Sequence, residues 1–207
     1  NIQAIEKAVD AQNGILLVSH VHSETGTSID LNQLSALCKE RNLRLAVDAT
    51  QSMGKPRSGW NLGSPDFIVG SAHKMGGEQG LGVVVDYARR LSHALIQGGT
   101  QQKSLRSGTY NAVGVIHWAL QWSRYCAINW HSMWDLVNET CFEGLAEKVE
   151  VRDVCEWIVL ARMKPELQDA FRERVDFSNG SACSSGLVSS AYESLFENPE
   201  EILRLSF

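Results

Sequence analysis

The chain is organised around residues 66–77, which read Asp66-Phe67-Ile68-Val69-Gly70-Ser71-Ala72-His73-Lys74-Met75-Gly76-Gly77. The apolar run Phe67–Val69 predicts a buried strand. A serine, a histidine and a lysine then follow its C-terminal end, which is where ligands bind in open α/β sheets. A lysine in this place can form a Schiff base with an aldehyde. A surface lysine that follows a strand is an equally simple interpretation of this stretch alone.

Bulk properties indicate a globular protein. The chain has 207 residues, 43% hydrophobic and 21% charged, with a net charge of −5, which argues against nucleic acid as the main partner. No apolar run reaches the roughly 18 residues of a membrane span, and residues 1–20 lack the pattern of a signal peptide. The five cysteines form no metal-binding pattern, so we expect no metal and a reducing, cytoplasmic location. They are Cys38, Cys126, Cys141, Cys155 and Cys183.

The chain before and after this stretch alternates strand and helix signals. Residues 15–18 and 43–47 are apolar strands, and the helix expected between them, from Leu31 to Asn42, predicts a right-handed parallel crossover. Residues 80–85 predict a strand that follows a short glycine-rich turn and therefore runs antiparallel to its predecessor. A short helix is expected over 89–96.

The second half of the chain is more helical at its start. Helical spacing of apolar residues predicts a helix over 111–126 and further helix through 127–150. A second, smaller region then begins with a strand near residues 157–160. Its other expected elements are a helix from Pro165, a helix over 188–196 and a strand over 202–207.

Two strand ends carry complementary chemistry. Asp48 ends one strand and Lys74 follows another, so both groups face one crevice if the strands lie close together in the sheet. A carboxylate that pairs with a pyridine nitrogen keeps the ring protonated, which lets pyridoxal phosphate (PLP) act as an electron sink. Gln51 could donate to the phenolic oxygen of such a ring, and Ser71 and His73 offer donors to its phosphate.

Taken together, these motifs resemble the class V aminotransferases of PLP fold type I, and among them the cysteine desulfurases of the NifS/IscS type. The resemblance is strong over about residues 14–115 and again over 177–207, and it is poor over 127–176. It rests on these segments: Val47-Asp48-Ala49-Thr50-Gln51-Ser52, Gly70-Ser71-Ala72-His73-Lys74, Gln97-Gly98-Gly99, Leu105-Arg106-Ser107-Gly108-Thr109, Ser178–Ser185 and Leu203-Arg204-Leu205-Ser206.

The resemblance implies a role for each matching residue in cofactor binding. Lys74 would carry the cofactor as a Schiff base, Asp48 would pair with the pyridine nitrogen and Gln51 would bind the phenolic oxygen. Ser71 and His73 would hold the phosphate, and His73 also belongs to the catalytic set. Thr109 would reach the phosphate bound by the partner subunit of a homodimer.

The resemblance also implies roles in substrate binding and sulfur transfer. Arg204 would clamp the carboxylate of L-cysteine. Ser23 stands where the family usually has an asparagine that contacts the cofactor ring and the substrate. Cys183 would take the sulfur as a persulfide and release alanine. Its small-residue loop resembles the longer, mobile form that hands sulfur to an acceptor or iron–sulfur scaffold protein.

The expected architecture follows from these assignments. It is an α/β fold with a mainly parallel sheet, in which 1–126 form a partial PLP-binding large domain and 127–207 form a small α+β domain with the cysteine loop. The chain starts after the first third of the family, so residues 15–18 or their neighbours should be exposed. We therefore expect the chain alone to be poorly stable, or to be completed by another polypeptide or a tight dimer.

Two other functions remain open from the sequence. The chain could be a truncated or degenerate homologue that binds a partner without turnover. It could also catalyse another class V reaction, such as selenocysteine lysis or cysteine C–S lysis. Binding of PLP separates the first alternative from the enzymes, and persulfide on Cys183 separates the desulfurase from the second.

Overall fold

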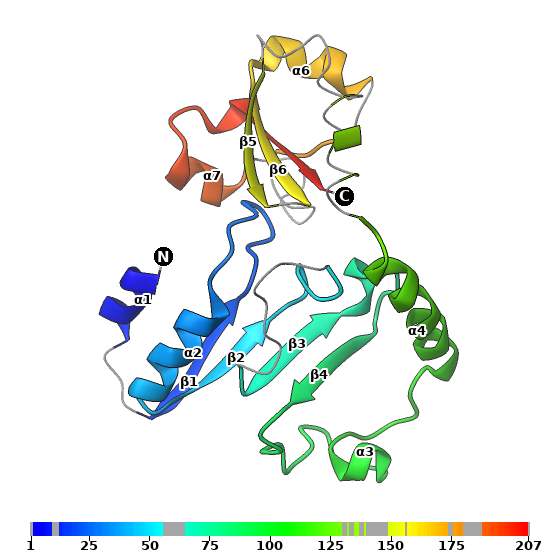
Figure 1. Cartoon of the computed structure of the whole chain (residues 1–207). Coiled ribbons are helices and arrows are strands. Elements are labelled where there is room, and N and C mark those ends of the chain that lie inside the picture. The colour runs from blue at the N-terminus through cyan, green and yellow to red at the C-terminus, as the bar shows by residue number, and fades with distance from the viewer. Residues whose placement is uncertain are drawn as a thin grey trace. The chain divides into compact units, whose positions relative to one another are not determined.

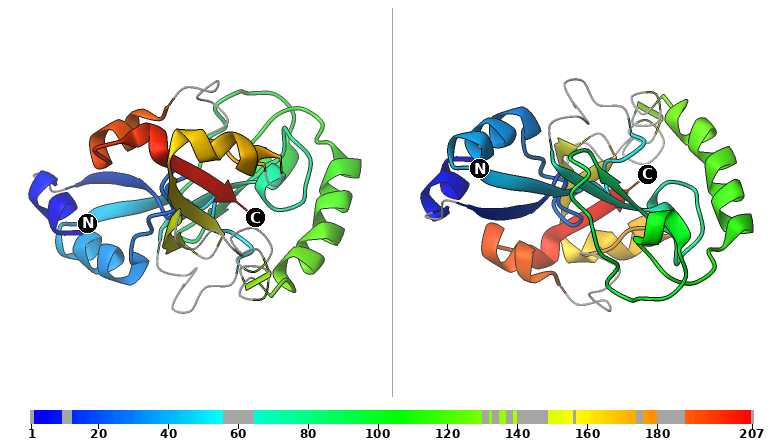
Figure 2. Two further views of the ribbon diagram at one scale, coloured as in Figure 1. Left: turned by 90° about the horizontal axis from the view of Figure 1, so that it is seen from above. Right: turned by 90° about the horizontal axis from the view of Figure 1, so that it is seen from below.

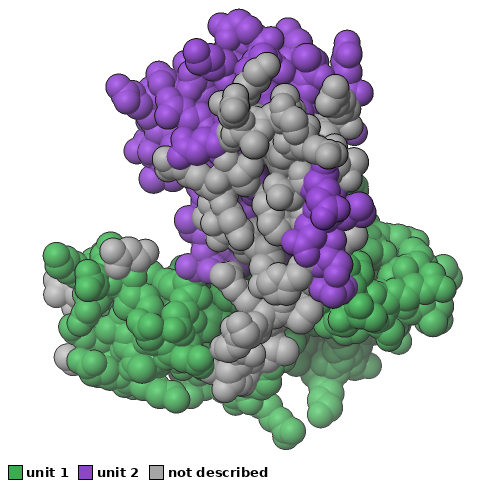
Figure 3. Space-filling view, turned by 45° about the horizontal axis from the view of Figure 1, so that its top comes forward, with its two compact units in different colours: residues 1–20, 29–128 green, residues 21–28, 129–207 purple. Residues whose placement is uncertain are grey.

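The computed structural model divides the chain into two compact units, which are described separately (Figures 1 and 3). Unit 1 comprises residues 1–20 and 29–128, and unit 2 comprises residues 21–28 and 129–207. The structure describes residues 2–9, 13–55, 65–129, 132, 135, 136, 139, 149–155, 157–173, 176–179 and 188–206. None of the helices in this described part of the chain is long and apolar enough to cross a membrane.

Unit 1 is built on a four-stranded sheet with the strand order β1-β2-β3-β4. β1 and β2 are parallel and are joined by a helix, and β2 and β3 are also parallel. β4 runs antiparallel to β3, as the short glycine-rich turn before it predicts. The elements of unit 1 are α1 (Ile2–Ala8), β1 (Gly14–Ser19), α2 (Leu31–Glu40), β2 (Leu43–Asp48), β3 (Phe67–Ser71), the 3₁₀ turn η1 (Ala72–Lys74), β4 (Gly82–Asp86), α3 (Gln101–Ser104) and α4 (Ala112–Cys126).

The core of unit 1 lies on one face of this sheet. α2 begins at its N-cap Asp30, whose carboxylate accepts the backbone N–H groups of residues 32 and 33. Its buried stripe, including Leu34, packs against Leu45 and Val47 of β2. α4 contributes Trp118 and Trp122 to the same cluster. Figure 1 shows α2 beside β1 and β2 and α4 beside the β3–β4 end, and Figure 2 shows the same arrangement from above and below.

The opposite face of the sheet is open. Side chains alternate along a strand, so the register places Ile15 and Leu17 of β1 on the face that does not carry Leu45 and Val47. Ile15 is 62% exposed, Leu17 is 68% exposed and Val84 of β4 is 56% exposed. The predicted exposure within residues 15–18 is therefore confirmed. An apolar face of this kind is typical of an interaction surface.

Unit 2 contains a three-stranded antiparallel sheet with the order β5-β6-β7. α6 begins at Pro165, whose missing N–H is unneeded in the first helical turn. β6 is buried along nearly all its length, and Tyr192 of α7 packs with Leu160 and Ile202 in the core. The elements are β5 (Val149–Cys155), β6 (Ile158–Met163), α6 (Pro165–Arg172), α7 (Ser190–Leu195), the 3₁₀ turn η3 (Pro199–Glu201) and β7 (Ile202–Ser206).

Two sequence predictions about local structure were wrong. Residues 89–96 form no helix, because the Asp86 carboxylate accepts the N–H of Leu91 and Arg89 has a positive φ of 50°, which together fix an irregular turn. The expected helix up to residue 150 also fails at its end, because β5 begins at Val149 and pairs with β6. Most of residues 130–148 lie outside the described residues.

Candidate active site

The candidate site in unit 1 lies where β2 and β3 end. Asp48 is the last residue of β2 and pairs directly with Val69 of β3, two residues before Ser71. Because side chains alternate, Asp48 and Ser71 belong to the open face of the sheet. The strands are parallel, so both residues lie at the same edge, and Lys74 follows in η1. The structure thus brings together the two strand ends that the sequence singled out.

The turn after β2 carries Asp48 and Gln51. The Asp48 carboxylate accepts the N–H of Thr50 at 2.9 Å through Oδ1. Its Oδ2 has no hydrogen bond to any residue that the structure describes. The turn closes on the Ala49 carbonyl, which accepts the N–H groups of Ser52 at 2.9 Å and Met53 at 2.7 Å. Asp48 therefore has one carboxylate oxygen available to a ligand.

The turn after β3 carries Ser71, His73 and Lys74. Ser71 Oγ and His73 Nδ1 are 2.7 Å apart, so the hydroxyl and the imidazole form a hydrogen-bonded pair. Lys74 is exposed, and its ammonium group makes no ion pair within the described parts of the chain. The turn is closed by the Ala72 carbonyl, which accepts the N–H groups of Met75 at 2.8 Å and Gly77 at 2.9 Å.

One member of the predicted cofactor set lies apart from these turns in the chain. Thr109 is exposed in the segment that precedes α4. The structure shows no hydrogen bond between Thr109 and another described residue. Its expected contact is with a partner subunit, so its role stays a prediction.

Local sequence patterns do not predict one contact in the same region, between His20 and Ser52. His20 follows β1, is only 5% exposed and has its Nδ1 2.7 Å from Oγ of Ser52. The backbone N–H of His20 also donates to the Asp48 carbonyl at 2.9 Å. These two bonds tie the end of β1 to the turn that carries Asp48. The two side chains are 32 residues apart in sequence, so no local sequence pattern predicts the contact.

In unit 2, Arg204 and Ser23 lie together. Arg204 is the middle residue of β7, and its Nε donates to the Ser23 carbonyl at 2.8 Å. The backbone of Arg204 also exchanges hydrogen bonds with Ser178, at 2.7 and 3.2 Å. Burial lowers the pKa of Arg204 from its ordinary value, although the nearby Tyr192 and Glu24 act in the opposite direction. Arg204 is half-buried, and partial burial of a charged group strengthens its interaction with an anion.

Glu24 makes a second set of contacts that local sequence patterns do not predict. Ser189, the N-cap of α7, donates its hydroxyl to the Glu24 carboxylate, and Tyr192 donates to the Glu24 carbonyl at 3.0 Å. These partners are 165 and 168 residues away in sequence. They hold the segment 21–28, which carries Ser23, against the rest of unit 2.

The predicted nucleophile Cys183 lies outside the described residues. Two of the other cysteines, Cys38 and Cys126, are free thiols. Cys38 is buried in the core of unit 1, and burial raises its pKa. Cys126 is exposed at the end of α4, so it is not a core residue. No group of three metal-ligating side chains occurs among the described residues.

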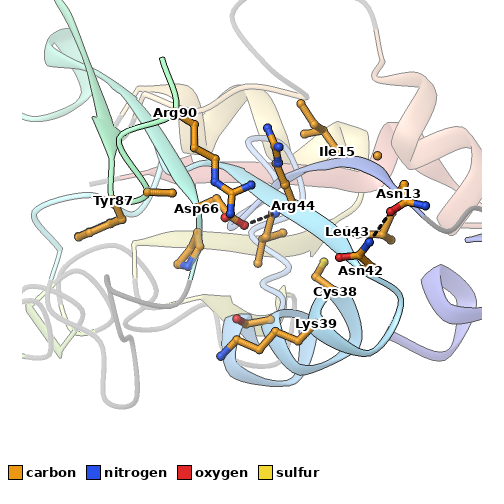
Figure 4. A pocket seen from close by; sticks show the side chains of 15 residues that line it. Asn13, Ile15, Cys38, Lys39, Asn42, Leu43, Arg44, Asp66, Tyr87 and Arg90 are labelled. Atoms are coloured by element: carbon orange, nitrogen blue, oxygen red, sulfur yellow. Dashed lines mark hydrogen bonds between the residues drawn. The ribbon is translucent and has the colours of Figure 1, made fainter. Parts of the chain in front are cut away.

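A pocket lies at the other edge of the sheet, where β1 and β2 begin (Figure 4). It is lined by the start of β2, by Asp66 and by residues after β4, with Lys39, Arg44 and Arg90 around it. Asp66 is engaged, because its carboxylate accepts the N–H of Leu45 at 2.9 Å. Ligands of parallel α/β sheets bind at the carboxyl ends of the strands, so this pocket does not replace the candidate site.

The donor set of unit 1 fits PLP. Among the described residues, the Lys74 amine has no ion pair, the Asp48 carboxylate has an oxygen without a hydrogen bond, and Ser71 pairs with His73, all at one edge of the sheet. These groups match the aldehyde, the pyridine nitrogen and the phosphate of the cofactor. The predicted roles of Lys74, Asp48, Ser71 and His73 are therefore compatible with the chemistry of these groups, and they stay predictions.

Comparison with known proteins agrees with this chemistry. The family model for class-V aminotransferases matches residues 1–140. The mitosomal cysteine desulfurase of Encephalitozoon cuniculi is 34% identical over 113 residues, which are 53% of this chain and 26% of that protein. The cysteine desulfurase IscS of Buchnera aphidicola is 33% identical over 113 residues, 53% of this chain and 28% of its own length. The matched segment thus covers about a quarter of the length of each of these curated relatives.

Solved structures show the same fold. A NifS-like protein from Rickettsia africae superposes with a TM-score of 0.75 at 20% identity, covering 100% of this chain and 61% of its own. A structure described as SspA in complex with cysteine gives a TM-score of 0.81 at 20% identity, covering 100% and 62%. The α/β fold with a mainly parallel sheet is therefore that of PLP fold type I. Class V aminotransferases depend on PLP, and this chain belongs to the class-V aminotransferase family.

Proposed function

We propose that the chain forms part of a PLP-dependent cysteine desulfurase, which converts L-cysteine to L-alanine and leaves a persulfide on Cys183. The observation that carries the proposal is the placement of Asp48 and Lys74 at one edge of the sheet, after the adjacent parallel strands β2 and β3. The relatives named cysteine desulfurases support the reaction class.

Unit 1 would bind the cofactor. The amine of Lys74 would attach it covalently, and the open oxygen of Asp48 would keep the pyridine nitrogen protonated. Gln51 would donate to the phenolic oxygen, and the Ser71–His73 pair would hold the phosphate. When bound, PLP supplies an electron sink for the bonds at the substrate α-carbon. Because His73 Nδ1 is engaged by Ser71 and Nε2 has no hydrogen bond to a described residue, Nε2 is the nitrogen that would move a proton.

Unit 2 would bind the substrate. Arg204 would take the carboxylate of L-cysteine through its terminal nitrogens, because its Nε is already used by the Ser23 carbonyl. One of these nitrogens also contacts Ser206 Oγ at 3.2 Å, a weak bond that a carboxylate can replace. Ser23 would lie beside the substrate by virtue of this bond.

The sulfur step is balanced without an added oxidant. The thiolate of Cys183 attacks the sulfur of the substrate, an S–S bond forms and the Cβ–S bond of the substrate breaks. The electron pair that remains on Cβ takes up a proton, which yields alanine. The persulfide would then pass to a sulfur acceptor or to a scaffold of iron–sulfur cluster assembly, and Thr109 would complete the partner's phosphate site in a homodimer.

The test is a single-turnover reaction of the PLP-loaded protein with L-cysteine. We expect one alanine and one Cys183 persulfide for each active site, measured by amino-acid analysis and by mass spectrometry of the cysteine-loop peptide. Binding of PLP without alanine would instead support a non-catalytic homologue. Sulfide release without persulfide on Cys183 would support C–S lysis, and turnover of selenocysteine alone would support a selenocysteine lyase.

A further inference from the structure

Tyr125 of α4 touches both turns that carry the predicted cofactor residues. Its hydroxyl donates to the backbone carbonyl of Lys74 at 2.8 Å, across 51 residues of sequence. Its ring lies against Gly54, in the turn that follows Asp48 and Gln51, where an added Cβ would stand 3.2 Å from ring atom Cδ1. The side chain therefore spans the two strand ends of the candidate site.

The bond to Lys74 fixes a part of the turn that its internal hydrogen bonds leave free. Both closing bonds of residues 72–77 go to the Ala72 carbonyl. The Lys74 carbonyl points out of the turn and is held by the Tyr125 hydroxyl. A held carbonyl restrains the peptide plane after Lys74, which includes the Cα atom from which the lysine side chain departs.

Other side chains of α4 hold the same turn close to the helix. Trp118 lies so near Gly77 that an added Cβ would stand 2.8 Å from its Cδ1, which only glycine permits. His117 Nδ1 is 3.8 Å from a carboxylate oxygen of Glu78. These contacts act on the end of the turn, whereas Tyr125 acts on Lys74 itself.

The Tyr125 hydroxyl is suited to a lasting structural bond. Tyr125 is half-buried, and burial raises its pKa well above the ordinary value for tyrosine. The hydroxyl therefore stays protonated and remains a donor throughout the pH range in which a lysine amine reacts with an aldehyde.

We propose that Tyr125 is a positioning residue, which sets Lys74 relative to the Asp48–Gln51 turn before the cofactor binds. The inference rests on the proposed function, because it gives the orientation of Lys74 its purpose. Tyr125 does not touch the reacting atoms. Its effect is to hold the amine ready, so that binding of PLP does not have to order the turn.

The experiment compares Tyr125→Phe with the parent and with Tyr87→Phe, made in the full natural polypeptide. Tyr125→Phe keeps the ring beside Gly54 and removes only the hydroxyl. Tyr87 is 46% exposed at the end of β4 and serves as the matched control. Hydrogen–deuterium exchange is measured without PLP, and the dissociation constant of PLP is measured from the absorbance of the lysine adduct.

We expect Tyr125→Phe to speed exchange in residues 72–77 and to leave residues 43–48 of β2 unchanged, which excludes general unfolding. The dissociation constant of PLP should rise about fivefold, the value of one net hydrogen bond of about 1 kcal/mol. Tyr87→Phe should match the parent in both measurements.

Three results would overturn the inference. They are unchanged exchange over 72–77, faster exchange over the whole sheet, and faster local exchange with an unchanged PLP dissociation constant. If the parent protein itself forms no adduct with PLP on Lys74, the proposed function fails first and this role of Tyr125 fails with it. The behaviour of the parent thus separates the two failures.

Discussion

The two units hold their predicted functional side chains in different ways. In unit 1, Lys74 is exposed and without an ion pair among the described residues, and Asp48 keeps one free carboxylate oxygen. In unit 2, Arg204 is partly buried and anchored to the Ser23 carbonyl, and the segment beside it is held by Ser189 and Tyr192. Unit 1 presents groups that await a ligand, whereas unit 2 presents a group that is already oriented.

Because of this difference, we expect substitutions in the two units to have separate effects. In unit 1 the backbone of the Lys74 turn is held by Tyr125, and a cofactor that bonds to several groups can order the exposed side chains that remain. A small substrate has little binding energy with which to order a long arginine side chain, so unit 2 has to pre-orient it. Variants of unit 1 should therefore alter the PLP spectrum, and variants of unit 2 should alter only cysteine binding and sulfur transfer.

The largest expected effect is that of Cys183→Ser in unit 2. The variant should keep the PLP absorbance and its change on addition of cysteine, because these need only Lys74, Asp48 and the carboxylate clamp. It should lose persulfide and sulfide release completely, because a serine hydroxyl is a poor nucleophile toward sulfur. Mass spectrometry measures the persulfide, and an alanine assay measures the turnover of cysteine. Alanine formation at the parent rate would show that Cys183 is not the nucleophile.

The second largest effect is expected for Asp48→Asn, which should change the chemistry of the bound cofactor. The amide cannot stabilise a protonated pyridine nitrogen, so we expect kcat to fall by about 100-fold or more. The PLP absorbance maximum should shift in the same variant, as the role in unit 1 requires. Steady-state kinetics and an absorbance spectrum check this prediction. A normal kcat together with an unshifted spectrum would refute the pairing of Asp48 with the ring.

Arg204→Lys should change binding of cysteine and leave the spectrum of bound PLP unaltered. Lysine keeps the positive charge but cannot bind a carboxylate through two parallel bonds, nor replace the bond from Nε to Ser23. We expect KM for L-cysteine to rise about 10- to 100-fold, which corresponds to a charged hydrogen bond of about 1.5–3 kcal/mol. An unchanged KM would remove Arg204 from the substrate site.

The smallest expected effect is that of Tyr192→Phe. The variant loses the bond to the Glu24 carbonyl but keeps the ring against Phe196, whose centroid is 5.8 Å away. We expect a loss of about 1 kcal/mol in the free energy of unfolding. Thermal unfolding of the variant measures it, with PLP affinity as the control. A loss of PLP affinity in Tyr192→Phe would contradict the expectation that variants of unit 2 leave cofactor binding unchanged.

Local sequence patterns predicted most of the fold. The apolar runs and the glycine-rich turn before β4 predicted the parallel crossover and the antiparallel strand, because each depends on neighbouring residues. The helix expected over 89–96 does not form, because the Asp86 side chain accepts the N–H of Leu91. Hydrophobic periodicity carries no information about such a hydrogen bond.

The candidate site was predictable only in part. Asp48 and Lys74 stand at strand ends that the sequence marks, so their common edge follows from the parallel pairing. The contacts of Tyr125 with Lys74 and of Ser189 with Glu24 join residues 51 and 165 positions apart. Such contacts arise only after the chain has packed, which is why no motif contains them.

The central claim is that Lys74 is the residue that binds PLP. The most direct measurement is reduction of the PLP-treated protein with borohydride, followed by peptide mapping by mass spectrometry. We expect one reduced pyridoxyl group on Lys74 in the parent and none in Lys74→Ala, with loss of the adduct absorbance. A reduced pyridoxyl group at another lysine of the parent, or an adduct that persists in Lys74→Ala, would contradict it.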